Sequence, residues 1–319
     1  MKFFNSFILH FIFFLFAINA FSQDSISFFA PASTFKKNRF EEVAALQAIG
    51  YGGSLAALNI AWYKNYSHSS FHFFNDNSEW LQVDKAGHFL TSWYLGRIGS
   101  DMYEWSGVKK KKAVLLGALS GWGYLTAIET LDGFSNGWGF SWGDFSANTL
   151  GSALIIGQKL IHSRTDAAGY LMTGFRNMSL KFSFHQTDYP QFRPTLLGQN
   201  LSEQILKDYN GQTYWLSMNI SSFMNYNSKF PKWLNVAFGY GAEGMISGSP
   251  GYYYVLPTGE QVEVVRNRKY FLSLDIDLAR IKTKSKFLKT LAETFCFIKI
   301  PAPSIEFSTK GVKAYGVYY

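Results

Sequence analysis

Cysteine is almost absent from this chain of 319 residues, and the single one, Cys296, lies near the C-terminal end. One cysteine excludes an internal disulfide, so the fold must depend on buried apolar area or on a membrane. It also excludes a lipid anchor of the bacterial lipoprotein kind, because that anchor needs a cysteine directly after an N-terminal apolar run. Crosslinks and lipidation are therefore not expected.

An apolar run does stand at the N-terminus, from Phe7 to Ala17, after Lys2 and before the small residues Ala20 and Ser22. Its length of about 11 residues is short of the ~20 that a spanning helix needs, and small residues suit the subsites of signal peptidase. We therefore predict a secretory signal peptide over residues 1–22 with cleavage before Gln23. The expected location is the cell envelope, in the periplasm or at the outer membrane.

Acidic residues are also scarce, with 22 Asp and Glu against 30 Lys and Arg, which gives a formal net charge of +8. Such an excess is common in proteins that bind nucleic acid, but export to the envelope argues against that partner. Membrane lipid or other anionic envelope components fit better. The alternative is that the four lysines at 109–112 form a solvated loop and account for half of the excess.

The fold class expected from hydropathy is α+β. Between residues 36 and 165, long apolar blocks rich in Ala, Gly and Leu predict a four-helix up-down bundle with helices at 41–63, 84–105, 112–131 and 141–161. Asp84 and Ser141 are expected to cap the second and fourth helices. The sequence shows no internal repeat and no low-complexity linker.

From residue 168 to 319 the hydropathic period falls to two, which is typical of an antiparallel β-sheet or partial barrel. A short helix is expected at 202–208, before the turn Asn210-Gly211. The strands are expected at 180–184, 214–220, 234–240, 269–278 and 312–319, with weaker signals at 252–256 and 261–265. Two alternatives stay open, a soluble sheet packed on the bundle and a sheet that is membrane-associated through its aromatic strands.

The four helices approach the length of membrane spans, but Arg97, Asp101 and Glu129 interrupt their apolar blocks. If the first helix starts outside the cytoplasm, the basic end of the bundle also lies outside, against the usual positive-inside arrangement. We therefore favour a periplasmic bundle over a spanning one. The basic residues of that end are Lys36, Lys37, Arg39, Lys109, Lys110, Lys111, Lys112, Lys159 and Arg164.

Polar residues stand where these helices should be apolar. They fall at the start of the second helix, the end of the third and the start of the fourth, and an up-down bundle brings these three positions to the same end. We therefore predict one polar cluster, with spacings of three or four that put neighbours on one helical face. Its members are Asp84, Lys85, His88, Glu129, Asp132, Asp144 and Asn148.

Three interpretations of this cluster remain open. It could be a structural hydrogen-bonded network in which Lys85 neutralises Glu129 or Asp132. It could bind a ligand, and carboxylates with one imidazole can hold a divalent cation without selecting a particular metal; the candidate ligands are Asp84, His88, Glu129 and Asp144. It could also supply general acid/base catalysis to a phosphate or ester substrate.

The order Asp-Lys-x-x-His-Phe, Glu, and Ser-x-x-Asp-x-x-x-Asn-x-x-Gly resembles the YfiM-like family of predicted periplasmic or outer-membrane proteins of unknown function. The stretches at 207–217 and 299–303 resemble the longer members of that family found in Bacteroidetes, so the similarity would cover nearly the whole mature chain. The matching positions in the bundle are Asp84, Lys85, His88, Phe89, Glu129, Ser141, Asp144, Asn148 and Gly151.

A fainter similarity extends to VanZ-like membrane proteins. Those chains tend to carry Gln three residues after the Glu and an Arg before the Ser, whereas this chain has Asp132 at the first place and no Arg between Glu129 and Asp144. A VanZ-like role in glycopeptide resistance is therefore not implied.

Two function classes follow from these patterns. The first is a non-enzymatic envelope protein that binds or scaffolds. The second is a membrane-associated enzyme that acts on a lipid or cell-wall substrate, with or without a metal. The sequence does not choose between them, and it names no cofactor.

Overall fold

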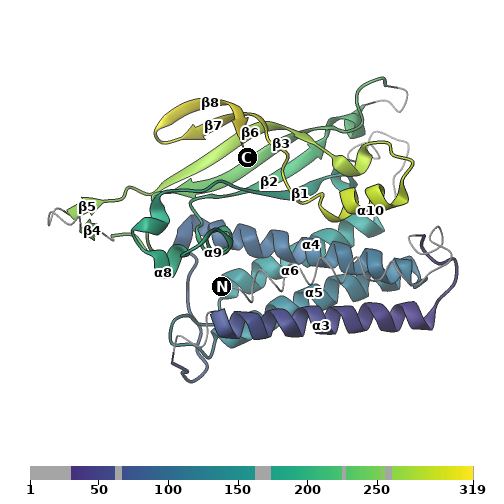
Figure 1. The fold of residues 1–319 in the computed structure, drawn as a ribbon, viewed down its shortest axis with the longest axis horizontal. Helices are drawn as coiled ribbons and strands as arrows, with labels where there is room; N and C mark the ends of the chain where they lie inside the picture. Colours follow the sequence, from purple (N-terminus) through teal and green to yellow (C-terminus); the bar gives the residue numbers. More distant parts are fainter. Residues whose placement is uncertain are drawn as a thin grey trace.

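The computed structural model describes residues 30–61, 67–161, 174–224, 228–251, 253–255 and 261–318. A helical layer lies below a β-sheet, and the two layers run along the same long axis (Figure 1). The predicted signal peptide, its cleavage site and Arg164 lie outside the described residues.

The helical layer contains four long helices: α3 (Lys37–Ala61), α4 (Val83–Trp105), α5 (Lys110–Asp132) and α6 (Trp142–Leu160). The predicted bounds were correct to within four residues. Ser141 caps α6 as expected, because its side chain accepts a hydrogen bond from the backbone N–H of Asp144.

The expected cap by Asp84 is wrong. The N-cap of α4 is Gln82, which makes no side-chain capping bond, and Asp84 lies inside the first turn. A 3₁₀ turn at Glu79–Gln82 precedes the helix and holds Trp80, Leu81 and Gln82 at positive φ. This turn starts the helix earlier than the sequence indicates and leaves the Asp84 carboxylate free to face Lys85.

Bundle and sheet share one core. Leu90 and Trp93 of α4 pack with Ala118 of α5, Ile155 of α6 and Leu180 of the first strand. Because residues of α4 contact both the neighbouring helices and the first strand in this cluster, α4 connects the helical layer to the sheet.

Small residues let α6 approach α4 closely. A Cβ placed on Gly151 would lie 2.3 Å from the backbone oxygen of Phe89 and 3.0 Å from the backbone nitrogen of Trp93. No side chain fits at that distance, so glycine at this position sets the separation of the two helices that carry His88 and Asn148.

Gly151→Ala should therefore lower the free energy of unfolding by about 1–3 kcal/mol, since the added methyl group must push the helices apart. Gly123→Ala is the matched control, because nothing lies within 4 Å of its added Cβ. That control should be neutral or stabilising by up to about 1 kcal/mol, the helix propensity of alanine over glycine. Urea denaturation of both variants measures the difference. Equal effects would contradict the close packing of α6 against α4 at Gly151.

The main sheet is open, antiparallel and six-stranded, in the order β1-β2-β3-β6-β7-β8. This confirms the α+β fold class. The strands are β1 (Ser179–Phe184), β2 (Gln212–Asn219), β3 (Leu234–Glu243), β6 (Asn267–Ile276), β7 (Ala302–Ser308) and β8 (Gly311–Tyr318). A separate hairpin consists of β4 (Tyr253–Val255) and β5 (Gln261–Glu263).

Short helices fill the connections: α8 (Pro194–Leu197), α9 (Leu201–Lys207) and α10 (Lys286–Thr294). The prediction of α9 is confirmed, whereas β7 and α10 were not predicted. α10 was missed because it is short and carries four lysines in and just before it, so no long apolar block marks it.

The sheet curls until distant strands touch. The ring of Tyr318 on β8 contacts Trp215 on β2 and Phe271 on β6. At the other edge, the backbone N–H of Phe182 on β1 donates to Phe297 at 2.7 Å, so the chain that leads into β7 covers this edge. The inner face is therefore enclosed.

The enclosed face of the sheet is polar. Lys181 and Asp275 form an ion pair of 2.6 Å whose side chains are 1% and 0% exposed, and the Ser217 hydroxyl donates to the same carboxylate. Lys299, which is also fully buried, lies 3.9 Å from the second oxygen of Asp275. The other face is apolar, and where α4 does not cover it, Phe238, Tyr270, Leu272, Leu274, Ile305 and Phe307 are exposed.

Two helices are long and apolar enough to cross a membrane, at Lys37–Ile60 and Lys110–Asp132. Their most apolar windows are 6% and 33% buried, so α3 in particular leaves most of its apolar surface open. Core helices of soluble proteins meet the same criterion of length and composition, so this finding by itself does not place either helix in a bilayer.

Candidate functional site

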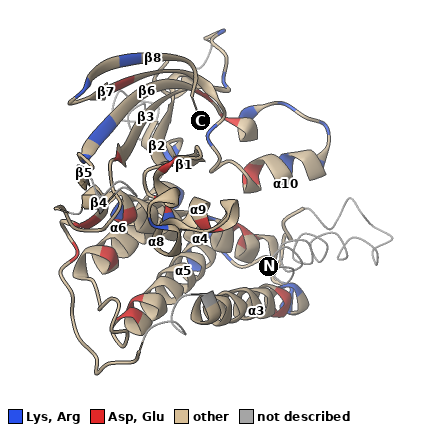
Figure 2. Ribbon diagram, turned by 60° about the vertical axis from the view of Figure 1, so that its left-hand side comes forward, with Lys and Arg blue, Asp and Glu red and all other residues tan. Residues whose placement is uncertain are grey.

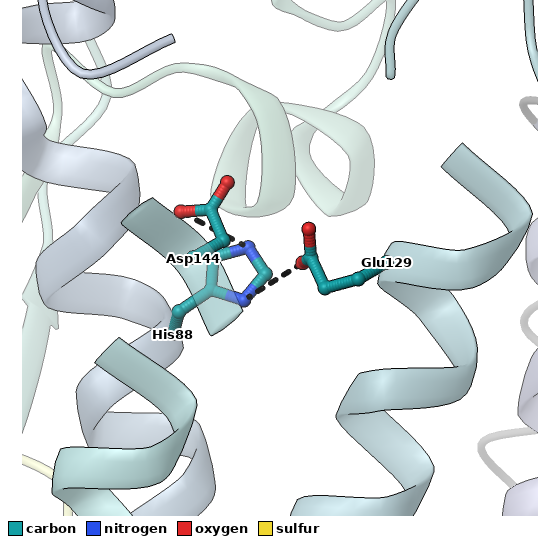
Figure 3. Close-up of side chains that lie close together, drawn as sticks. All are labelled: His88, Glu129 and Asp144. Carbon is teal, nitrogen blue, oxygen red and sulfur yellow. Dashed lines mark ion pairs between the residues drawn. The ribbon is translucent and has the colours of Figure 1, made fainter. Parts of the chain in front are cut away.

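The first turns of α4 and α6 and the last turn of α5 meet at one end of the bundle. His88 comes from α4, Glu129 from α5 and Asp144 from α6 (Figure 3), and Asn148 also lies on α6. The His88 Nδ1 atom lies 3.2 Å from Asn148 Oδ1 and 3.5 Å from Glu129 Oε1, and Nε2 lies 3.9 Å from Asp144 Oδ1. The structure thus brings together residues that are up to 60 positions apart.

Lys85 lies beside this group and forms ion pairs with three carboxylates. Its Nζ is 2.6 Å from Asp76, 2.9 Å from Asp84 and 3.1 Å from Asp144. The structural interpretation of the cluster had paired Lys85 with Glu129 or Asp132 instead. The difference arises because Lys85 and Asp84 are adjacent at the start of α4, whereas Glu129 faces the opposite side of His88.

Asp76 was not predicted as a member of the polar cluster. The loop that carries it pairs with the segment between α5 and α6, through Phe74 N–H to Phe140 O at 3.0 Å, and the Ser141 hydroxyl donates to Asp76 Oδ1 at 2.6 Å. The available signal was the short polar run Asn-Asp-Asn-Ser directly before α4. That run looks like an ordinary turn unless the tertiary contact is known.

Asp84 and Asp132 lie at the edges of the site. Asp84 groups with Asp76 and Asp144 around Lys85 and does not belong to the ligand group of His88. Asp132 ends α5 and belongs to neither group among the described residues, although its charge acts on Glu129.

Burial changes the protonation of the site. It raises the pKa of Glu129 to about 9, and the negative charges of Asp144 and Asp132 add to the rise. Burial also raises the pKa of Asp144 to about 6, although His88 and Lys85 oppose it. For Lys85, burial would lower the pKa, but the carboxylates of Asp84 and Asp144 outweigh burial and raise it.

Several buried atoms of the site lack a hydrogen-bond partner among the described residues: Asp84 Oδ1, Glu129 Oε1, Asp144 Oδ1 and Asn148 Nδ2. Leaving buried polar atoms unpaired is costly, so such a group is expected to have another occupant. His88, Glu129 and Asp144 each offer one ligand atom, and these atoms lie within 4.8 Å of one another. The His88 side chain is 25% exposed, so the group can be reached from solvent.

Aromatic rings surround this end of the bundle. Phe73 stacks on Trp142 with ring centroids 5.6 Å apart, and Phe140 contacts both rings. Phe71 packs against Phe134 just after α5. These rings pack the loop that carries Asp76 against the segment between α5 and α6.

A family model matches this part of the chain. Residues 72–157 match the family described as predicted periplasmic lipoprotein (DUF2279). The matched segment contains α4, α5 and most of α6, with every residue of the polar cluster, and it covers just over a quarter of the chain. No curated protein and no solved structure matches the chain.

The match supports an uncharacterised family of periplasmic proteins and confirms the expected localisation in the cell envelope. The family's description includes the word lipoprotein. The single cysteine of this chain, Cys296, is buried and accepts a hydrogen bond from Arg97 at 2.7 Å.

Proposed function

We propose that this chain is a cell-envelope protein whose helical bundle binds a divalent cation through His88, Glu129 and Asp144. The observation that carries the proposal is the unpaired carboxylate oxygen of Glu129, which is 1% exposed and faces a histidine and a second carboxylate. A buried carboxylate must be protonated or compensated by a positive charge. The ion pairs of Lys85 go to Asp76, Asp84 and Asp144, so a bound cation would supply that charge.

The ligand atoms suit such an ion. One imidazole nitrogen with two carboxylate oxygens is a donor set for Zn²⁺ or Mn²⁺, and water can complete the coordination from the open side of His88. A proton on His88 Nδ1 can be donated to Asn148 Oδ1. This hydrogen bond orients the ring and directs the lone pair of Nε2 toward Asp144. The resemblance to the YfiM-like family agrees with an envelope role and adds no activity.

The test is thermal unfolding of the full-length protein, first with EDTA and then with Zn²⁺ or Mn²⁺. Saturation at 100 times the dissociation constant should add about 2.7 kcal/mol, or roughly 5 to 10 °C in the melting temperature. Glu129→Gln should abolish this shift, yet it should raise stability in EDTA at neutral pH, because the buried carboxyl must take up a proton on folding and the neutral amide need not. Glu79→Gln, a half-buried carboxylate outside the ligand group, is the control and should keep the shift.

The same variants give a pH test. Glu129 and Asp144 have pKa values of about 9 and about 6 in the folded chain, above those of unfolded Glu and Asp. Their stabilising contribution is therefore complete below about pH 4 and is lost as the pH rises through these values. In EDTA, wild type should lose stability from about pH 4 to pH 9, and Glu129→Gln should flatten the upper part of this range. A metal-independent, pH-independent melting curve would contradict the proposal.

An enzyme acting on a lipid or cell-wall ester or phosphate is the second candidate. It is favoured by the separated pKa values, because at neutral pH Glu129 would be the acid and Asp144 the base, both beside the partly open His88. Hydrolysis of a model ester or phosphate that disappears in Asp144→Asn, with the fold intact, would favour this candidate over simple binding.

A further inference from the structure

α10 has an exposed apolar face. Phe287, Leu288 and Leu291 are 41%, 52% and 41% exposed, and Phe295 and Ile298 continue the same apolar side just after the helix. Residues at these spacings lie on one side of an α-helix. In a protein surrounded by water, five large exposed apolar side chains on so short a segment indicate an interaction surface.

The charged residues of this segment are almost all cationic. Arg280, Lys282, Lys284, Lys286 and Lys289 fall within ten residues, and no acidic residue stands between Asp277 and Glu293. In Figure 2, blue bands mark Lys and Arg along α10 and the chain next to it. A helix with one apolar face and a lysine-rich remainder is the pattern of helices that lie in the plane of a membrane surface.

The opposite side of the segment is fixed to the bundle. The Tyr94 hydroxyl donates to the backbone oxygen of Thr294 at 2.5 Å, and the Tyr94 ring contacts Phe297 with centroids 4.5 Å apart. Arg97 donates to Cys296 at 2.7 Å. These contacts fix the end of α10 against α4, while Phe287, Leu288 and Leu291 stay exposed.

More cations lie at the same end of the molecule, where α3 begins, α4 ends and α5 begins (Figure 1). Residues 109–112 are all lysine and all exposed. Because they occupy the N-cap and first turn of α5, they face the positive end of the helix dipole, which is unfavourable in water. An anionic surface next to this end would relieve that repulsion.

We propose that α10 docks on an anionic phospholipid bilayer, with its apolar face among the acyl chains and its lysines at the headgroups. Charge complementarity selects this occupant: an acidic protein would match the lysines but would not require five exposed large apolar side chains beside them. The docking surface lies at the end of the bundle opposite to the polar cluster, so it does not depend on cation binding there.

The experiment is flotation of the purified full-length protein, in EDTA, with phosphatidylcholine vesicles that contain or lack phosphatidylglycerol. We expect binding to the anionic vesicles that weakens at high salt. Each lysine near an anionic surface is worth about fivefold in affinity, so Lys282→Glu with Lys284→Glu should weaken binding by about 30-fold or more. Leu288→Asp should weaken it by at least tenfold, since it places a charge in the acyl region.

Matched controls lie elsewhere on the surface. Lys310→Glu with Lys313→Glu makes the same change in net charge at two exposed lysines of the β7–β8 hairpin, and Leu206→Asp changes a leucine of α9 that is 52% exposed, as Leu288 is. Both controls should bind as wild type does. Equal binding to neutral and anionic vesicles, no binding to either, or equal losses in the α10 variants and their controls would each overturn the proposal. Circular dichroism melting confirms that every variant is folded.

Discussion

Replacing Lys85 with methionine should lower the free energy of unfolding by about 3–5 kcal/mol, enough to unfold much of the helical bundle at 37 °C. The ammonium lies within 3.1 Å of carboxylates from Asp76, Asp84 and Asp144, and its side chain is only 14% exposed. Without it, three partly buried negative charges face one another with no compensating side chain. Urea denaturation followed by circular dichroism measures the loss.

Two comparisons make the Lys85 result specific. Lys159→Met removes an ammonium that also meets two carboxylates, but its partner Asp101 is 55% exposed, so the expected loss is below about 1 kcal/mol. Adding Asp144→Asn to Lys85→Met should recover part of the stability by removing one of the repelling charges. Equal effects at Lys85 and Lys159 would show that the quartet around Lys85 contributes no more than a surface ion pair.

Asp275→Ala should destabilise the β half by a similar amount, about 3–5 kcal/mol. This carboxylate is fully buried, pairs with Lys181 at 2.6 Å, lies 3.9 Å from Lys299 and accepts a hydrogen bond from Ser217. Its removal leaves two buried ammonium groups that keep only backbone carbonyl partners. Asp101→Ala, which breaks an exposed Asp–Lys pair, is the control and should cost less than about 1 kcal/mol.

The pH dependence of the Asp275 variant provides a second check. Burial lowers the pKa of Lys299 to about 8, although Asp275 opposes the shift. Between about pH 8 and pH 10.5 the unfolded lysine therefore binds more protons than the folded one, and this group makes stability rise with pH. In Asp275→Ala the opposing carboxylate is gone, so the rise should begin at lower pH. A variant whose stability stays flat from pH 7 to pH 10 would contradict a charged, buried Lys299.

The helical layer could be predicted closely because its signal is local. Long apolar blocks with polar ends mark α4, α5 and α6, and the Ser141 hydroxyl gives the start of α6. The strands were found for the same reason, since alternation with period two is visible in each segment alone. The segments that were missed, β7 and α10, have short or lysine-interrupted patterns that resemble loops.

The convergence of His88, Glu129, Asp144 and Asn148 also followed from sequence, because chain direction in an antiparallel bundle decides which helix ends meet. The pairing of charges within that end did not follow. Lys85 pairs with Asp76, Asp84 and Asp144 rather than with Glu129, because the loop before α4 pairs with the segment before α6 and so brings Asp76 to the same side of α4.

The sequence by itself determined the fold class, the helix and strand positions and the end of the bundle where the polar residues gather, since each depends on periodicity and chain direction. Only the tertiary structure decided that Glu129 has a buried carboxylate oxygen without a hydrogen-bond partner among the described residues, that the curled sheet encloses its polar face, and that α10 leaves its apolar face open. These features depend on which surfaces cover one another, and a linear pattern of polar and apolar residues carries no information about that.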